Sequence, residues 1–187
     1  LQALVPIHLD LAIRRQRNRR GSVMDETTEG CVGFVDLAGS TSLSQCLAPG
    51  ELGHMVDRFE EVAHEVAVNR GGRIVKFIGD EVMFVTPDAN SGCDIALALI
   101  EAFAADPSMN PRGGLAMGRM LDRGGDCYGP IVNLAARLAE EAVPGEVLIP
   151  KETCPVVQDA GLRCEPAGRR QLRGFAEPVP LVSVSRA

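Results

Sequence analysis

Aromatic residues are scarce in this sequence: tryptophan is absent, tyrosine occurs once, and aromatics make up 4% of the chain. Hydrophobic residues nevertheless account for 45% of its 187 residues. We therefore expect one domain of ordinary size, with or without an appendage, whose core rests on Val, Leu, Ile and Ala. No apolar run approaches the length of about 18 residues that a bilayer-spanning helix needs, so we expect no direct membrane span in this fragment.

The cysteine patterns of metal and redox sites are also missing. None of the six cysteines belongs to a C-x-x-C pair or lies beside a histidine at zinc-site spacing. Several lie in apolar surroundings, where cysteine behaves as a small hydrophobic residue. We therefore expect reduced cysteines and a cytoplasmic location. No signal peptide is visible, and because the chain begins with Leu1 rather than methionine, we expect a fragment of a longer protein.

An excess of positive charge is absent as well. The net charge is −6, and on that account we expect no nucleic-acid partner. An anionic nucleotide could still bind where cations or metal ions gather. Residues 1–27 differ from the rest, since an apolar start is followed by clustered arginines and then by small, polar and acidic residues. We interpret residues 1–27 as an N-terminal arm or linker, either solvated or joined to an upstream regulatory domain, and residues 28–187 as the folded domain.

The clearest pattern that is present is a β-hairpin over residues 73–85. Two apolar runs, rich in β-branched and aromatic residues, flank a short break that contains Gly79 and Asp80. Glycine and aspartate tolerate the dihedral angles of a tight turn. Lys76 lies inside the first run, where a cation is costly unless it meets a partner or a ligand. We therefore expect the hairpin to present charge for a function.

The order of strand-like and helix-like patterns predicts the fold class. Helices are indicated by apolar residues at three- and four-residue steps, and strands by short apolar runs between turn residues. The predicted elements are a strand at 31–35, a helix at 51–69, the hairpin at 73–85, a helix at 93–105, a strand at 113–118, a helix at 131–142, a strand at 146–149, a short helix at 151–160 and a terminal hairpin at 169–184. This order predicts an α+β, two-layer fold with a ferredoxin-like βαββαβ core, extra C-terminal strands, and helices on one face of a mainly antiparallel sheet.

Two aspartates are candidates for chemistry. Asp36 and Asp80 each end a predicted strand next to a glycine-containing turn, so a ferredoxin-like core would bring them together. Paired carboxylates are hard oxygen ligands that suit Mg²⁺ or Mn²⁺. Taken alone, each could equally be a turn or cap residue. Small and hydroxylic residues follow Asp36 and suit a phosphate at a helix N-terminus; they are Gly39, Ser40 and Thr41.

Three segments, in order, resemble the three sequence motifs of class III nucleotidyl cyclase catalytic domains, and the bacterial adenylyl cyclases are the most similar branch. The segments are residues 34–41, 75–81 and 123–138, and the resemblance extends over residues 30–184. It implies that Asp36 and Asp80 hold two Mg²⁺ or Mn²⁺ ions, with help from the Leu37 backbone.

The resemblance also implies how ATP is recognised. Lys76 and Asp126 occupy the family's purine-selecting positions, and their types fit adenine, because lysine can donate to a ring nitrogen and aspartate can accept from the exocyclic amine. Asn133 would orient the ribose, and Arg137 would stabilise charge on the transferring phosphate. The two lie at i and i+4 on one helix face. An ordinary polar helix residue and a surface arginine without any role in catalysis could have the same spacing. Candidates for binding the other phosphates are Gly39, Ser40, Thr41, Arg123 and Arg173.

The implied product is cyclic AMP, formed with pyrophosphate at sites that two chains of a head-to-tail homodimer share. Lys76 and Asp80 would then serve different sites. Three alternatives remain open: a guanylyl cyclase, which Lys76 and Asp126 disfavour; another palm-type enzyme, such as a diguanylate cyclase or a polymerase; and a cyclase-like interaction domain without activity.

Overall fold

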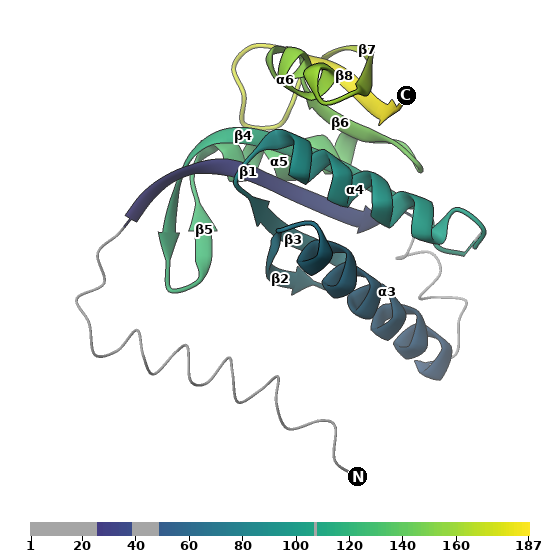
Figure 1. Cartoon of the computed structure of the whole chain (residues 1–187). Helices are drawn as coiled ribbons and strands as arrows, with labels where there is room; N and C mark the ends of the chain where they lie inside the picture. The colour runs from purple at the N-terminus through teal and green to yellow at the C-terminus, as the bar shows by residue number, and fades with distance from the viewer. Residues whose placement is uncertain (1–25, 39–48, 107) are drawn as a thin grey trace.

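The computed structural model describes residues 26–38, 49–106 and 108–187 (Figure 1). Strands and helices alternate along the chain much as the sequence predicts. The elements are β1 (Glu26–Leu37), α3 (Pro49–Asn69), β2 (Arg73–Ile78), β3 (Glu81–Thr86), α4 (Ala89–Phe103), β4 (Pro111–Arg123), β5 (Asp126–Tyr128), α5 (Pro130–Glu141), β6 (Val147–Pro150), the 3₁₀ turn η1 (Lys151–Thr153), α6 (Cys154–Asp159), β7 (Leu162–Arg170) and β8 (Val179–Arg186).

The strands form one sheet in the order β2-β3-β1-β4-β6-β8-β7, and β5 pairs with β4 outside this order. Every pairing is antiparallel except the one between β4 and β6, which is parallel. The run β2-β3-β1-β4, with α3 and α4 as its two connecting helices, is the ferredoxin-like core. The predicted fold class is therefore confirmed, with β6, β8 and β7 as the additional C-terminal strands.

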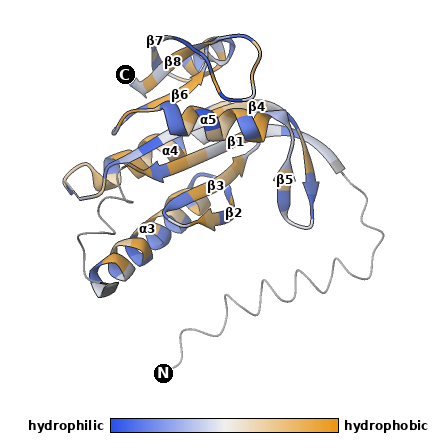
Figure 2. Cartoon of the chain, turned by 180° about the vertical axis from the view of Figure 1, so that it is seen from behind, coloured by the Kyte–Doolittle hydropathy of each residue, from blue (hydrophilic) through white to orange (hydrophobic). Residues whose placement is uncertain are grey.

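Side chains of β1 alternate between two apolar layers. Cys31 and Val35 belong to the cluster that contains residues of α3 and α4, whereas Val32 and Phe34 belong to the cluster that contains residues of α5. The expectation of helices on one face thus holds for α3 and α4, but α5 covers the opposite face. Figure 2 shows hydrophilic and hydrophobic residues alternating around the helices, as expected of amphipathic helices on a sheet.

Several elements are longer than their apolar patterns. β1 begins at Glu26, two residues before the expected domain boundary, and β4 continues to Arg123, past the end of the predicted strand at 113–118. The two strands pair from Glu26 opposite Asp122 to Leu37 opposite Pro111. Backbone hydrogen bonds extend a strand regardless of side-chain polarity, so apolar patterns miss polar strand ends. The terminal hairpin likewise begins earlier, at Leu162.

The described cysteines are all free thiols, as expected; they are Cys31, Cys93, Cys127, Cys154 and Cys164. Burial raises the pKa of the Cys31 thiol to about 12, which makes it unreactive. The sixth, Cys46, lies outside the described residues, as do the arginine cluster and Gly39, Ser40 and Thr41. Within the described ranges, no helix has both the length and the hydrophobicity needed to cross a membrane.

Candidate active site

Asp36 and Asp80 lie side by side at one end of the sheet. Antiparallel pairing of β1 with β3 sets Asp36 opposite Glu81, and the N–H of Leu37 donates to the backbone oxygen of Asp80 at 3.4 Å. The turn between β2 and β3 contains Gly79, whose φ of 65° is left-handed and therefore favours glycine. The two aspartates that the sequence singled out are thus brought together by strand pairing and a tight turn.

Negative charge is concentrated and partly buried here. Burial raises the pKa of Asp36, and the neighbouring Asp80 charge raises it further, against the opposing effect of Arg112. Burial, together with Asp36 and Glu140, raises the pKa of Glu81 to about 7. Among the described residues, the buried Oδ2 atom of Asp80 finds no hydrogen-bond partner. Such a cluster favours a bound cation.

The carboxylate oxygens of this cluster suit a divalent ion whose coordination shell is completed by a bound substrate. In the part of the chain that the structure describes, no three His, Cys, Asp or Glu side chains are arranged to enclose a metal. Mg²⁺ commonly takes one or two carboxylates and fills its remaining positions with water and substrate phosphates. Asp36 and Asp80 match this mode of binding, since one Asp80 oxygen has no hydrogen-bond partner within residues 26–38, 49–106 and 108–187.

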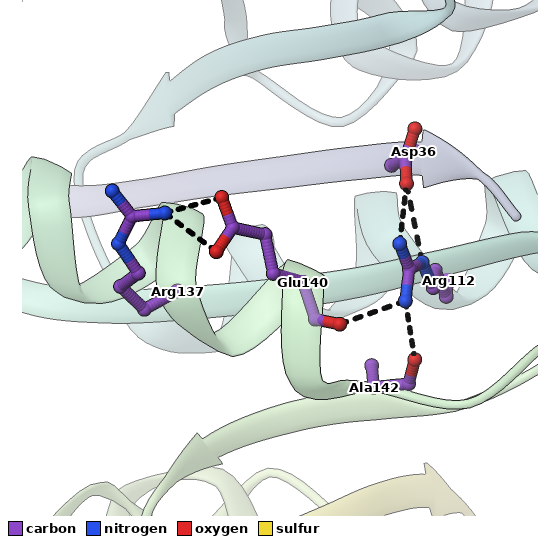
Figure 3. Close-up of polar contacts among 5 residues, drawn as sticks. All are labelled: Asp36, Arg112, Arg137, Glu140 and Ala142. Atoms are coloured by element: carbon purple, nitrogen blue, oxygen red, sulfur yellow. Dashed lines mark hydrogen bonds and ion pairs between the residues drawn. The ribbon is translucent and has the colours of Figure 1, made fainter. Parts of the chain in front are cut away.

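Arg112 is a member of the site that sequence reasoning missed. It lies opposite Asp36 in the β1–β4 register, and its Nε and Nη2 atoms donate to Oδ2 of Asp36 at 3.1 and 2.9 Å. Its Nη1 atom donates to the backbone oxygens of Glu140 and Ala142, at 2.8 and 3.0 Å (Figure 3). Arg112 therefore balances the aspartate charge and caps the C-terminal end of α5, where a cation is favourable.

A second group of predicted residues surrounds a surface cavity of about 580 Å³. Asn133 and Arg137, one turn apart on α5, line it together with Arg173 from the loop after β7. The remaining lining residues are Gly129, Pro130, Gly174 and Phe175. Arg123, the other candidate cation, lies at the end of β4 opposite Asp126 and does not line the cavity.

Glu140 holds the guanidinium group of Arg137. The Nη1 atom of Arg137 donates to both carboxylate oxygens of Glu140, three residues further along α5. Figure 3 shows that the same residue contacts Arg112 through its backbone oxygen. Glu140 therefore links the aspartate pair to the arginine on α5, and no motif in the sequence indicated this role.

Lys76 and Asp126 form a third group. The Nζ atom of Lys76 donates to both carboxylate oxygens of Asp126, at 2.9 and 2.7 Å. Asp126 also accepts from the backbone N–H of Cys127 at 2.9 Å and from the hydroxyl group of Tyr128 at 3.3 Å. Burial would raise the pKa of Asp126, but the bonds from Lys76 and Cys127 outweigh it and lower the pKa overall. The ionised carboxylate and the ammonium group thus form one preassembled donor–acceptor pair.

Comparison with known proteins shows which family the sequence matches. Residues 23–182 match the family model of the adenylate and guanylate cyclase catalytic domain. The chain is 41% identical over 151 residues to an adenylate cyclase of Glutamicibacter nicotianae, covering 80% of this chain and 38% of that protein. It is 43% identical over 119 residues to an adenylate cyclase of Streptomyces coelicolor, covering 63% of this chain and 31% of that protein.

Comparison with solved structures indicates the same family. The crystal structure of the adenylyl cyclase CyaB from P. aeruginosa superposes with a TM-score of 0.77 at 26% identity, covering 87% of this chain and 97% of that one. The family match spans most of the chain, whereas the chain spans less than two fifths of the two curated relatives. The resemblance seen in the three sequence motifs is thereby confirmed, and the chain belongs to the family of adenylate and guanylate cyclase catalytic domains.

Proposed function

We propose that this chain is the catalytic domain of an adenylate cyclase that converts ATP to 3′,5′-cyclic AMP and pyrophosphate. The observation that carries the choice of base is the contact between Lys76 and Asp126, at 2.7 and 2.9 Å. Relatives that are 41 and 43% identical are named adenylate cyclases, which supports the same choice.

The hydrogen-bonding edge of adenine matches this pair, whereas that of guanine does not. Adenine offers an acceptor ring nitrogen and a donor amine, which complement the ammonium group of Lys76 and the carboxylate of Asp126. Guanine offers a carbonyl and a ring N–H at the corresponding positions. With guanine bound, polar groups of the site would be left without partners, and that costs more than a missing apolar contact.

Asp36 and Asp80, with the Leu37 backbone, would hold two Mg²⁺ or Mn²⁺ ions. The buried oxygen of Asp80, which has no partner in the described part of the chain, and the raised pKa of Asp36 support cation binding at this place. Bound ions would stabilise the attacking and leaving oxygens during displacement at phosphorus. Arg112, which pairs with Asp36 in the free chain, would be released toward other anionic groups when an ion takes that carboxylate.

The residues of the α5 cavity would act on the ribose and phosphates. Asn133 would orient the ribose so that its 3′-hydroxyl attacks the α-phosphate, and Arg137 would stabilise the charge that develops there. Arg173 shares this cavity, so we favour it over Arg123 as the cation for the terminal phosphates. Gly39, Ser40 and Thr41 remain proposed phosphate contacts that lie outside the described residues.

We further propose a head-to-tail homodimer with two shared sites. The residues that line the α5 cavity include neither Asp36 nor Asp80. A site that needs both sets is readily completed by the aspartates of a second copy, and two-fold symmetry then produces two equal sites.

A product assay tests the proposal directly. The purified chain is incubated with ATP or GTP, with Mg²⁺ or Mn²⁺, and cyclic nucleotides and pyrophosphate are quantified. We expect cyclic AMP and pyrophosphate in equal amounts, with ATP used in preference to GTP. A matched control is Asp80→Asn, which removes charge at the aspartate pair and should abolish product. Preference for GTP, or no product with either metal, would overturn the proposal.

A further inference from the structure

Arg73 connects the strand that carries Lys76 to the hairpin that carries Asp126. Its Nη2 atom donates to Oδ2 of Asp122, on β4, at 2.8 Å. Its Nη1 atom donates to the backbone oxygen of Gly125, in the turn between β4 and β5, at 3.1 Å. A single half-buried guanidinium group therefore forms hydrogen bonds to both β4 and the turn that follows it.

The turn end of the β4–β5 hairpin lies beyond the main sheet, because β4 pairs with β1 only as far as Asp122. β5 has three residues and pairs with β4 alone among the described strands. Its turn contains Gly124 and Gly125, both at positive φ, and a Cβ atom added at either would meet nothing within 4 Å. Figure 1 shows this hairpin extending away from the main body of the sheet. Contacts made from β2 therefore help to position Asp126, together with the burial of Cys127 in the cluster that contains α5.

Two side chains of β2, those of Lys76 and Arg73, make such contacts. A bound base would affect the hydrogen bonds of these two side chains differently. Lys76 contacts Asp126 directly, but both groups would have to redirect hydrogen bonds when a purine enters between them. Arg73 contacts Asp122 and a backbone oxygen, neither of which we assign to base recognition. Its bonds can persist while the base is bound, and they then maintain the distance between β2 and the hairpin.

We propose that Arg73 is a positioning residue for base recognition. By holding Asp122 and the Gly125 carbonyl, it sets the spacing between Lys76 and Asp126 and so sustains the preference for adenine over guanine. This inference rests on the proposed adenylate cyclase function. A bidentate guanidinium group suits the task because its rigid, planar donors fix both direction and distance.

The test compares Arg73→Met, Arg73→Lys and Asp122→Asn with wild type, measuring kcat and KM for ATP and GTP. Arg70→Met is the matched control, since Arg70 forms a similar ion pair with Asp94 at 2.8 Å away from the hairpin. We expect Arg73→Met to raise the KM for ATP about tenfold and to reduce the ATP-to-GTP preference similarly, with kcat changing less. Asp122→Asn should shift both in the same direction, and Arg73→Lys should restore part of the preference.

Binding of fluorescent ATP and GTP analogues with a blocked 3′-hydroxyl group gives a second readout that needs no turnover. We expect wild type to prefer the ATP analogue, and Arg73→Met to lose most of that preference. An unchanged preference in both Arg73→Met and Asp122→Asn, or an equal loss in Arg70→Met, would overturn the positioning role. If wild type binds the ATP analogue selectively but makes no cyclic AMP, the proposed function fails while the role of Arg73 remains open to this binding test.

Discussion

At the scale of single residues, the aspartate pair is a place where charge is balanced inside the protein. Arg112 contacts Asp36 at 2.9 Å and bonds the end of α5, so one guanidinium group serves both the site and the fold. Because the Oδ2 atom of Asp80 keeps no hydrogen-bond partner among the described residues, the balance is incomplete without a cation. The excess of negative charge also affects the ionisation of Glu81, whose pKa is raised.

Glu81 should make the metal-free protein less stable as the pH rises. Its carboxyl group has an ordinary pKa of 4.5, and burial with nearby negative charge raises the pKa to about 7 in the folded protein. The unfolded chain therefore loses this proton first, and the stability contributed by the neutral group, complete below about pH 4.5, is gone by about pH 7. We expect Glu81→Gln to have the same Tm as wild type at acid pH. Above pH 7 its Tm should be higher than that of wild type. Thermal melts in EDTA from pH 4 to pH 8 measure the difference in Tm between the variant and wild type. A difference in Tm that became smaller toward neutral pH would contradict the raised pKa of Glu81.

Base preference should follow the two residues of the donor–acceptor pair. Replacing Lys76 by Glu and Asp126 by Ser puts an acceptor in place of the donor at one position and, at the other, replaces a carboxylate that only accepts with a hydroxyl group that can donate. We expect kcat/KM for ATP to fall by about 10² or more and GTP to become the better substrate, because guanine then finds matching partners. The ratio of kcat/KM values for the two nucleotides measures the effect. A double variant that kept its preference for ATP would show that other residues select the base.

At the scale of elements, the placement of α5 is decisive because this helix carries Asn133 and Arg137. It packs with its backbone directly against β4 at Gly114, where an added Cβ atom would lie 2.1 Å from the backbone nitrogen of Ala139. A contact this close cannot be relieved by rotating a side chain. The small residue on β4 therefore sets how closely the helix, and with it the cavity wall, approaches the sheet.

Gly114→Ala should displace α5 and weaken both folding and turnover. Forcing extra volume into a packed backbone contact costs about 1–3 kcal/mol, so we expect a clearly lower Tm and a fall in kcat of tenfold or more. Gly53→Ala in α3 is the matched control, since a Cβ atom there meets nothing within 4 Å. Alanine in a helix interior should leave that variant as stable as wild type or more so. Equal effects of the two substitutions would show that α5 tolerates the displacement.

At the scale of the whole molecule, the proposed shared sites make oligomeric state part of the mechanism. Asp36→Ala and Arg137→Ala should each be inactive alone, because every site of either homodimer lacks one essential group. After the two are mixed and exchanged, half of the dimers should be mixed ones with a single intact site, which restores about a quarter of wild-type activity. A coupled pyrophosphate assay measures the recovery.

The control for this experiment is a mixture of Asp36→Ala with Asp80→Ala. Both substitutions affect the same half of the site, so no mixed dimer contains an intact site and no activity should return. Recovery in the control, or its absence in the Asp36→Ala and Arg137→Ala mixture, would argue that each chain holds a complete site by itself.

The sequence alone determined what depends on local patterns. The hairpin at residues 73–85, the order of strands and helices, and the three motifs follow from turn chemistry, apolar spacing and residue types at fixed separations, all of which are short-range. The family and the α+β class could be predicted for the same reason. Site roles inferred from the motifs remain predictions, although the pairing of β1 with β3 does bring Asp36 to Asp80, and a side-chain contact joins Lys76 to Asp126.

Only the tertiary structure decided which distant residues meet. Arg112 faces Asp36 through the β1–β4 register, Glu140 holds Arg137, and Arg173 rather than Arg123 shares the α5 cavity. The structure also places α5 on the face opposite α3 and α4. Such contacts depend on the register of strands far apart in the chain and on which face of the sheet each helix buries. Neither is encoded in local periodicity, because both result from packing the whole core at once.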